Sequence, residues 1–398
     1  MYRSMEYSGG DSGGQCDVDY ACPTRTVCPG SSLGGDAVGA AAVCCVLHLF
    51  VWSDCCWLFT STYVPGDNQV QSRVGLEVAD QRGHPYRIVS YLMSSVSSIE
   101  TFIAHPPLIV HSSLSQLRYL VLSEGMPASN ERSVARCRAH VWSILSRTSM
   151  EGSTSLYLSL VSRGPPPAHV YQKIKNDTFR TLNTDRQFSA TVSEDSLVRC
   201  LSCFAWHQLE SSSSRNVVSS YVQGMNVLLA PLLYTCPSEP MAYQLFSKLC
   251  LEHIPTYLNN QLSGVHNAAK LLDRCLQIID PKLSKFLTDH LLTAEIYGIP
   301  SILTLSSCTR PLHQVCKLWD FMFAYGFHMN ILFIVAQLVV VRAQIMSSDS
   351  PMNLLRNFPE FDADDIIRLG VGFVAKLPSK LYDLLVHHTL DFDLVVKT

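Results

Sequence analysis

The chain has 398 residues, of which 47% are hydrophobic and 16% charged, and its 30 basic and 33 acidic side chains give a formal net charge of −3. This near-neutral balance excludes the strongly basic surface by which proteins bind nucleic acid or an anionic membrane. The apolar content suffices for one large hydrophobic core or two ordinary ones, because domains typically span roughly 100–200 residues.

Residues 1–92 differ in composition from the rest of the chain. They hold seven of the fifteen cysteines, five arginines, no lysine and nine acidic residues, and they are rich in Gly and Ser. No helical or alternating apolar period is sustained there. We expect a low-complexity tail and favour a native start at Met93, where a fresh MSSVSSIE stretch precedes a regular pattern. Residues 1–92 would then not belong to the native protein.

An apolar run at residues 37–59 nearly reaches the roughly 20 residues that a transmembrane helix requires. His48 and Asp54 interrupt it, and the residues before it are acidic, unlike the basic start of a secretory signal. These features favour an accessory tail over a membrane span.

From about residue 114, apolar residues recur at intervals of three and four, which predicts amphipathic helices joined by short loops. The first clear stripe spans residues 134–145 and leaves Arg132, Arg136 and Arg138 on other faces of the helix. A second helix begins at the N-cap Ser193, where two acidic residues in the first turn suit the helix dipole.

Further along the chain, a stripe at residues 265–279 ends at Asp280, which caps the next helix with Pro281 at its first position. The apolar run at 331–341 is too short to span a bilayer and predicts a buried central helix. Two amphipathic stretches follow at 364–375 and 379–388. The pattern therefore predicts an all-α body whose last helices pack against the same core.

The sequence lacks the motifs of common self-contained active sites: GxxxxGK[ST], GxGxxG, HExxH and GxSxG. Cys200 and Cys203 form a lone CxxC on an apolar helical face, which favours core packing over zinc or redox chemistry. No ligand spacing connects three further groups, which we assign to tail or solvated surface: Cys16, Cys22 and Cys28; His387 and His388; and Asp362, Asp364 and Asp365.

Two short segments interrupt the helical pattern. The first, Ile174-Lys-Asn-Asp177-Thr-Phe-Arg180, follows a Pro-rich turn, and the second, Tyr221-Val-Gln223-Gly224-Met225-Asn226, follows a Ser-rich loop. Taken singly, Arg180 would be an ordinary surface residue and Gln223 a residue at the start of a helix.

The ordered pair IxxDxxR and YxQGMN resembles the signature of the TBC-domain proteins, GTPase-activating proteins of Rab-type small GTPases. Five other elements agree in order: Gly125-Met-Pro127, Arg138-Ala-His-Val-Trp142, Pro300, Leu318-Trp319-Asp320 and Gly326. The resemblance implies a TBC-type helical domain of two helical subdomains at residues 120–345. A tail (1–92) and a lead-in segment (93–119) would precede it, and a helical extension (346–398) would pack on it.

Longer stretches, among them YQKIKNDTFRTL and LWDFMFAYGFHMNILF, resemble the fungal checkpoint branch of this family, which restrains the mitotic-exit or septation-initiation network. This implies a cytoplasmic protein that, at the spindle pole body, forms a two-component activator with a scaffold subunit and acts on a Ras-superfamily GTPase. It would be an activator rather than an enzyme. It would need no metal or cofactor of its own, because the GTPase carries GTP and Mg. It would have no nucleic-acid partner and no membrane span.

The resemblance also implies roles for the two segments. Arg180 would be an arginine finger and Gln223 a glutamine finger. Asp177 would orient Arg180 within the motif that Ile174 opens, and the residues around Gln223 would shape its loop: Tyr221, Gly224, Met225 and Asn226. The presence of both fingers favours an activator over a non-catalytic TBC adaptor that binds and localises the GTPase. A third alternative, a Rab activator anchored in a membrane by residues 37–59, is disfavoured by Asp54 and by the expected start at Met93.

Overall fold

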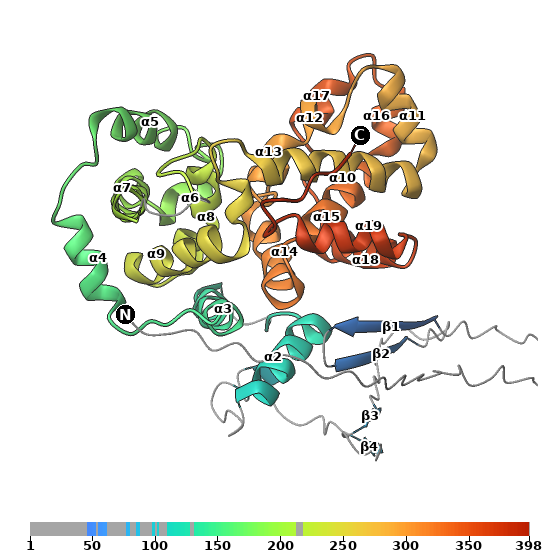
Figure 1. Cartoon of the computed structure of the whole chain (residues 1–398), viewed down its shortest axis with the longest axis horizontal. Coiled ribbons are helices and arrows are strands. Elements are labelled where there is room, and N and C mark those ends of the chain that lie inside the picture. Colours follow the sequence, from blue (N-terminus) through green and yellow to red (C-terminus); the bar gives the residue numbers. More distant parts are fainter. Residues whose placement is uncertain are drawn as a thin grey trace, which may run out of the picture. The chain divides into compact units, whose positions relative to one another are not determined.

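The computed structural model describes residues 110–127, 131–211 and 218–397, together with shorter stretches before them: 46–52, 55–61, 77–79, 85–87, 98–99 and 102. The chain divides into two compact units, Met1–Ser90 and Tyr91–Thr398 (Figure 1). Both sequence motifs lie in the second unit.

The described part of the first unit consists of two antiparallel hairpins. Strand β1 (Val46–Trp52) pairs with β2 (Cys55–Ser61), and β3 (Glu77–Ala79) pairs with β4 (Pro85–Arg87). The sequence pattern did not indicate these strands, because short apolar runs such as VLHLFVW have no period that separates strand from helix. Cys16, Cys22 and Cys28 lie outside the described residues. Within the described ranges, no helix has both the length and the apolar character to cross a membrane.

The unit from Tyr91 onward is helical wherever the structure describes it, apart from its loops and one isolated bridge between Val218 and Asn259. This confirms the all-α prediction for the body of the chain. The first helices are α2 (Val110–Glu124), α3 (Glu131–Leu145), α4 (Ser153–Val161), α5 (Ala168–Thr178), α6 (Arg186–Thr191), α7 (Glu194–Glu210), α8 (Met225–Thr235) and α9 (Glu239–Lys248).

A π-helical turn (Leu249–His253) and a 3-10 turn (Pro255–Tyr257) lead into the second group of helices. These are α10 (Ser263–Ile279), α11 (Pro281–Asp289), α12 (Ala294–Tyr297), α13 (Ile299–Leu303), α14 (Leu312–Tyr325), α15 (Met329–Val340), α16 (Arg342–Ser347), α17 (Pro351–Arg356), α18 (Ala363–Val374) and α19 (Ser379–His387). Figure 1 shows α4–α9 as one group and α10, α11 and α15–α19 as another, within the single compact unit Tyr91–Thr398. The division into two helical subdomains stays a prediction.

The predicted helix boundaries at Ser193 and Asp280 are confirmed. The Ser193 hydroxyl accepts the backbone N–H of Ser196 at 3.1 Å, and the Asp280 carboxylate accepts that of Leu283 at 3.0 Å. Pro281 occupies the first turn of α11, where its missing N–H has no cost.

The predicted central helix corresponds to α15, in which every residue from Met329 to Leu338 is buried. It packs against α10, α13 and α18. The contact with α18 is close at Gly370, where a Cβ atom would lie 2.7 Å from Phe333 Cδ1. Glycine at this position lets the two helices approach closely without displacing Phe333. The burial of ten consecutive residues places α15 at the centre of the core.

A buried ion pair joins α3 to α14. Arg138 donates from Nε to both carboxylate oxygens of Asp320 at 2.8 and 3.0 Å and from Nη2 at 2.9 Å, and Trp142 Nε1 donates to the same carboxylate at 2.9 Å. The two charged side chains are only 11% and 7% exposed. The stripe at 134–145 placed Arg138 away from the apolar face, but Asp320 compensates its charge and allows it to be buried.

The surface prediction for the two adjacent histidines is wrong for His388. His387 is exposed, whereas His388 is fully buried, with its Nε2 2.7 Å from the Tyr257 hydroxyl. Successive helical residues point about 100° apart, so the end of α19 presents one ring to solvent and the other to the core. The prediction holds for the exposed acidic group, in which Asp362 caps α18. Cys200 and Cys203 are free and buried, as core packing requires.

Candidate functional site

Helix α5 carries the first motif and presents it with one face buried. Pro167 precedes the helix, and Val170 and Ile174, four residues apart, fix its inner face in the core. One turn further on, Asp177 is also buried. Arg180 follows in the turn after the helix, with its side chain 53% exposed. The helix thus ends by placing a buried carboxylate beside an exposed guanidinium.

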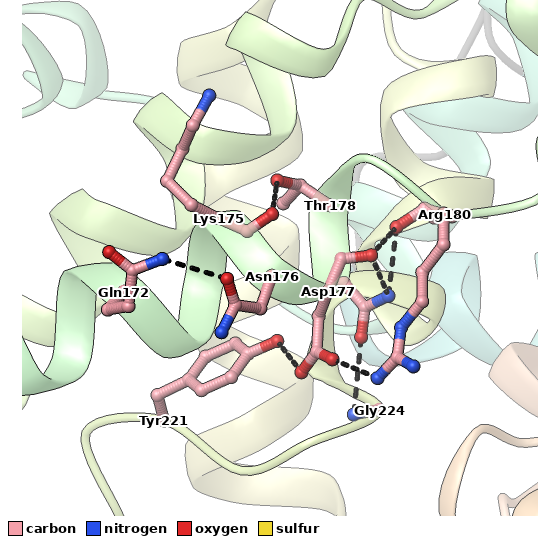
Figure 2. A network of polar contacts seen from close by, with 10 residues as sticks. Gln172, Lys175, Asn176, Asp177, Thr178, Arg180, Tyr221 and Gly224 are labelled. Atoms are coloured by element: carbon pink, nitrogen blue, oxygen red, sulfur yellow. Dashed lines mark hydrogen bonds and ion pairs between the residues drawn. The ribbon is translucent and has the colours of Figure 1, made fainter.

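Asp177 connects the two motifs through its two carboxylate oxygens. Arg180 Nη2 forms an ion pair with Oδ1, and the Tyr221 hydroxyl donates to Oδ2 at 2.8 Å. Figure 2 shows Asp177 between the two partners. Because the Asp177 side chain is only 8% exposed, water competes little for either oxygen. Asp177 thus contacts Arg180 directly, and its orienting role stays a prediction.

The Tyr221 hydroxyl is a stable donor in this arrangement. Burial raises the pKa of this phenol above its usual range, and the hydrogen bond to the negative Asp177 raises it further. The group therefore stays protonated at neutral pH and cannot act as a general base there.

Asn226, at the start of α8, adds a second connection between the motifs. Its Nδ2 donates to Thr181 Oγ1 at 2.8 Å and to the backbone oxygen of Asp177 at 3.3 Å, and its Oδ1 accepts the Gly224 N–H at 3.2 Å. Thr181 Oγ1 in turn donates to the Asp177 backbone oxygen at 3.0 Å. Thr181 was not predicted from the sequence, although it directly follows Arg180.

The turn around Gln223 is shaped by its neighbours. Gly224 has a φ of 108°, a conformation that favours glycine, and Met225 is fully buried below it with its sulfur accepting the Val222 N–H at 3.1 Å. Gln223 lies in the turn before α8, not within the helix, and is exposed. The turn thus projects the Gln223 side chain away from the core.

The two motifs meet in one open hollow of about 370 Å³, lined by Lys173, Asn176, Asp177, Arg180, Tyr221 and Gln223. Of the predicted site residues, four line this hollow, and Ile174, Gly224, Met225 and Asn226 do not. Lys173 and Asn176 were not predicted. They precede Asp177 and Arg180 by four residues each, so helical spacing from the motif is the signal that would have found them.

The hollow suits an anionic ligand presented by another molecule. It contains two cationic side chains, Lys173 and Arg180, against one carboxylate, and a single arginine–aspartate contact leaves other guanidinium N–H groups available as donors. The Gln223 amide offers both a donor and an acceptor. Across the described residues, no group of three or more His, Cys, Asp or Glu side chains is placed to hold a metal ion.

Comparison with known protein families identifies the class of protein to which the chain belongs. Residues 135–346 match the Rab-GTPase-TBC domain, and the chain belongs to that family. The fold agrees, because the solved Ypt/Rab-GAP domain of Gyp1p superimposes with a TM-score of 0.54 over 66% of this chain and 92% of that one, at 16% sequence identity.

Among individual proteins, the chain is similar to the mitotic check point protein BUB2 of Saccharomyces cerevisiae, with 66% identity over 76% of this chain and 100% of the yeast protein. It is also similar to cell division control protein 16 of Schizosaccharomyces pombe, with 42% identity over 70% of this chain and 89% of that protein. A putative mitotic check point protein BUB2 of Dictyostelium discoideum is 39% identical over 71% of this chain and 77% of its own length. The predicted family and its fungal checkpoint branch are thereby confirmed.

Proposed function

We propose that this protein is a GTPase-activating protein that supplies Arg180 and Gln223 in trans to a Ras-superfamily small GTPase. The observation that carries the proposal is the shared hollow, in which two exposed residues from separate motifs stand together above a buried carboxylate. Membership of the Rab-GTPase-TBC family supports it.

Arg180 would stabilise the transition state of GTP hydrolysis. Negative charge develops on the phosphate oxygens as the terminal phosphoryl group is transferred, and a planar guanidinium can donate to two of them. Asp177 pairs with Nη2 of Arg180, and the remaining guanidinium N–H groups would donate to the phosphate. Such a finger contributes on the order of 10³–10⁵ in rate in characterised GTPases.

Gln223 would hold the attacking water in line with the phosphate, accepting from the water through its amide oxygen and donating through its amide nitrogen. GTP and Mg would be brought by the GTPase. The protein would therefore need no metal or cofactor of its own and would be an activator rather than an enzyme.

The relatives also support a proposal for the cellular role. Similarity to BUB2 of Saccharomyces cerevisiae and to cell division control protein 16 of Schizosaccharomyces pombe supports a negative regulator of mitotic exit or septation. In our proposal it acts with a scaffold subunit as a two-component activator, in the cytoplasm and at the spindle pole body.

Single-turnover GTP hydrolysis by a panel of small GTPases, with and without the scaffold subunit, tests this function. We expect Arg180→Ala and Gln223→Ala each to lose most of the stimulation while still binding the GTPase. Arg368→Ala is a matched control, because Arg368 also pairs with an aspartate three residues before it, on the surface of α18. Full stimulation by Arg180→Ala would refute the arginine finger. Binding without stimulation by the unaltered protein would instead identify a non-catalytic TBC adaptor.

A further inference from the structure

Phe179, immediately before Arg180, is unusually exposed for its residue type. Its exposed fraction is 66%, and of the Phe, Tyr and Trp residues whose burial the structure describes, it alone is classed as exposed. Single exposed apolar side chains are normal on a protein surface. Phe179 is notable among them for its position, because it directly precedes the candidate arginine finger Arg180.

The backbone fixes Phe179 beside the hollow. It caps α5 with helical angles (φ −62°, ψ −22°), and the Arg180 N–H continues the turn by donating to the Asp177 backbone oxygen. Phe179 therefore extends the helical row that contains Gln172 and Asn176, whose side chains are hydrogen-bonded at 2.8 Å. Asn176 and Arg180 both line the hollow, so Phe179, which lies between them in sequence, is adjacent to residues of the lining without being one of them.

We infer that Phe179 is a recognition residue that docks onto an apolar patch of the small GTPase, next to its nucleotide site. This inference rests on the proposed function. In this inference, a GTPase that presents its phosphates to the Arg180 guanidinium also covers the neighbouring Phe179, and burial of the exposed ring away from water favours association. Rigid aromatic side chains at the centre of an interface typically contribute a large share of the binding energy. A phenyl ring offers no hydrogen-bond donor to a phosphate, so the contribution of Phe179 would lie in association and not in chemistry.

The test separates association from chemistry. Phe179→Ala, Phe179→Leu and the unaltered protein are compared for KM and kcat in stimulated GTP hydrolysis, and for binding to the GTPase loaded with a non-hydrolysable GTP analogue. We expect Phe179→Ala to raise KM and weaken binding about ten-fold, with kcat within about two-fold. Phe179→Leu should recover part of the loss. The loss should not diminish at high salt, because burial of an apolar surface is not screened.

Leu158→Ala is the matched control, since Leu158 is 58% exposed on α4, which contributes no residue to the hollow. Unchanged KM and binding for Phe179→Ala, with stimulation intact, would overturn this inference and leave the proposed function standing. If the unaltered protein binds the GTPase without stimulating it, and Phe179→Ala still weakens binding, the inference stands and the catalytic function fails. A GTPase panel in which nothing binds would overturn both.

Discussion

Removal of Asp320 should destabilise the helical unit severely. Asp320→Ala leaves the Arg138 guanidinium buried without its carboxylate and leaves the Trp142 indole N–H without its acceptor. Loss of one member of a buried ion pair costs about 3–5 kcal/mol, and an orphaned indole donor adds about 1 kcal/mol. Since domains are typically stable by about 5–15 kcal/mol, we expect a variant that is only marginally folded.

Urea unfolding, followed by tryptophan fluorescence, measures this loss. Two of the five tryptophans, Trp142 and Trp319, report on the site because their rings lie 5.8 Å apart and Trp142 donates to the Asp320 carboxylate. The double variant Arg138→Met/Asp320→Leu should recover most of the stability, since no charge is then left unpaired. Asp289→Ala is the control, because its pair with Lys285 is exposed and contributes at most about 0.5 kcal/mol. An Asp320→Ala variant within about 1 kcal/mol of the unaltered protein would refute the reasoning.

Three further predictions concern the site and the buried histidines. Tyr221→Phe removes one of the two partners of Asp177, so stimulated hydrolysis should fall up to about ten-fold in single-turnover assays; an unchanged rate would contradict this. Gly224→Ala introduces a Cβ at a positive φ and 3.0 Å from a leucine side chain, so urea unfolding should show a loss of about 1–2 kcal/mol, and no loss would contradict a strained turn. Burial lowers the pKa of His388 to about 4 and that of His328 to about 3. As the pH falls, these histidines are protonated in the unfolded chain before they are protonated in the folded one. The free energy of unfolding should therefore be highest above about pH 6.5 and fall as the pH drops towards 4. A profile of urea midpoints that is flat over this range would contradict the prediction.

The sequence was most informative where the physical signal is local. Periodic apolar residues and capping side chains predicted α7, α10 and α15, because helix ends and faces depend on residues a few positions apart. The order of the motifs, compared with a known family, also predicted that residues from two separate segments belong to one site. No spacing argument alone would have done so.

The features that were missed depend on contacts distant in sequence. The burial of Arg138 requires Asp320, 182 residues later, and the burial of His388 requires Tyr257, 131 residues earlier. An argument from neighbouring residues assigns such charged and polar side chains to the surface, because the distant partners that allow their burial do not appear in the local sequence. The strands β1 and β2 were missed for another reason, since their apolar runs fit a helix as well as a strand.

The connection of the two motifs through Asp177 and Asn226 has a consequence for the thermodynamics of association. Segments 44 to 49 residues apart are hydrogen-bonded to each other in the free protein, so their conformational entropy is already lost when the chain folds. A partner that binds Arg180 and Gln223 would then have to order little additional backbone. Less of the interaction energy would therefore be offset by the loss of conformational entropy on binding. Amide hydrogen exchange would report this as one cooperative unit, in which residues 177–181 and 221–226 open together and not as two independent loops.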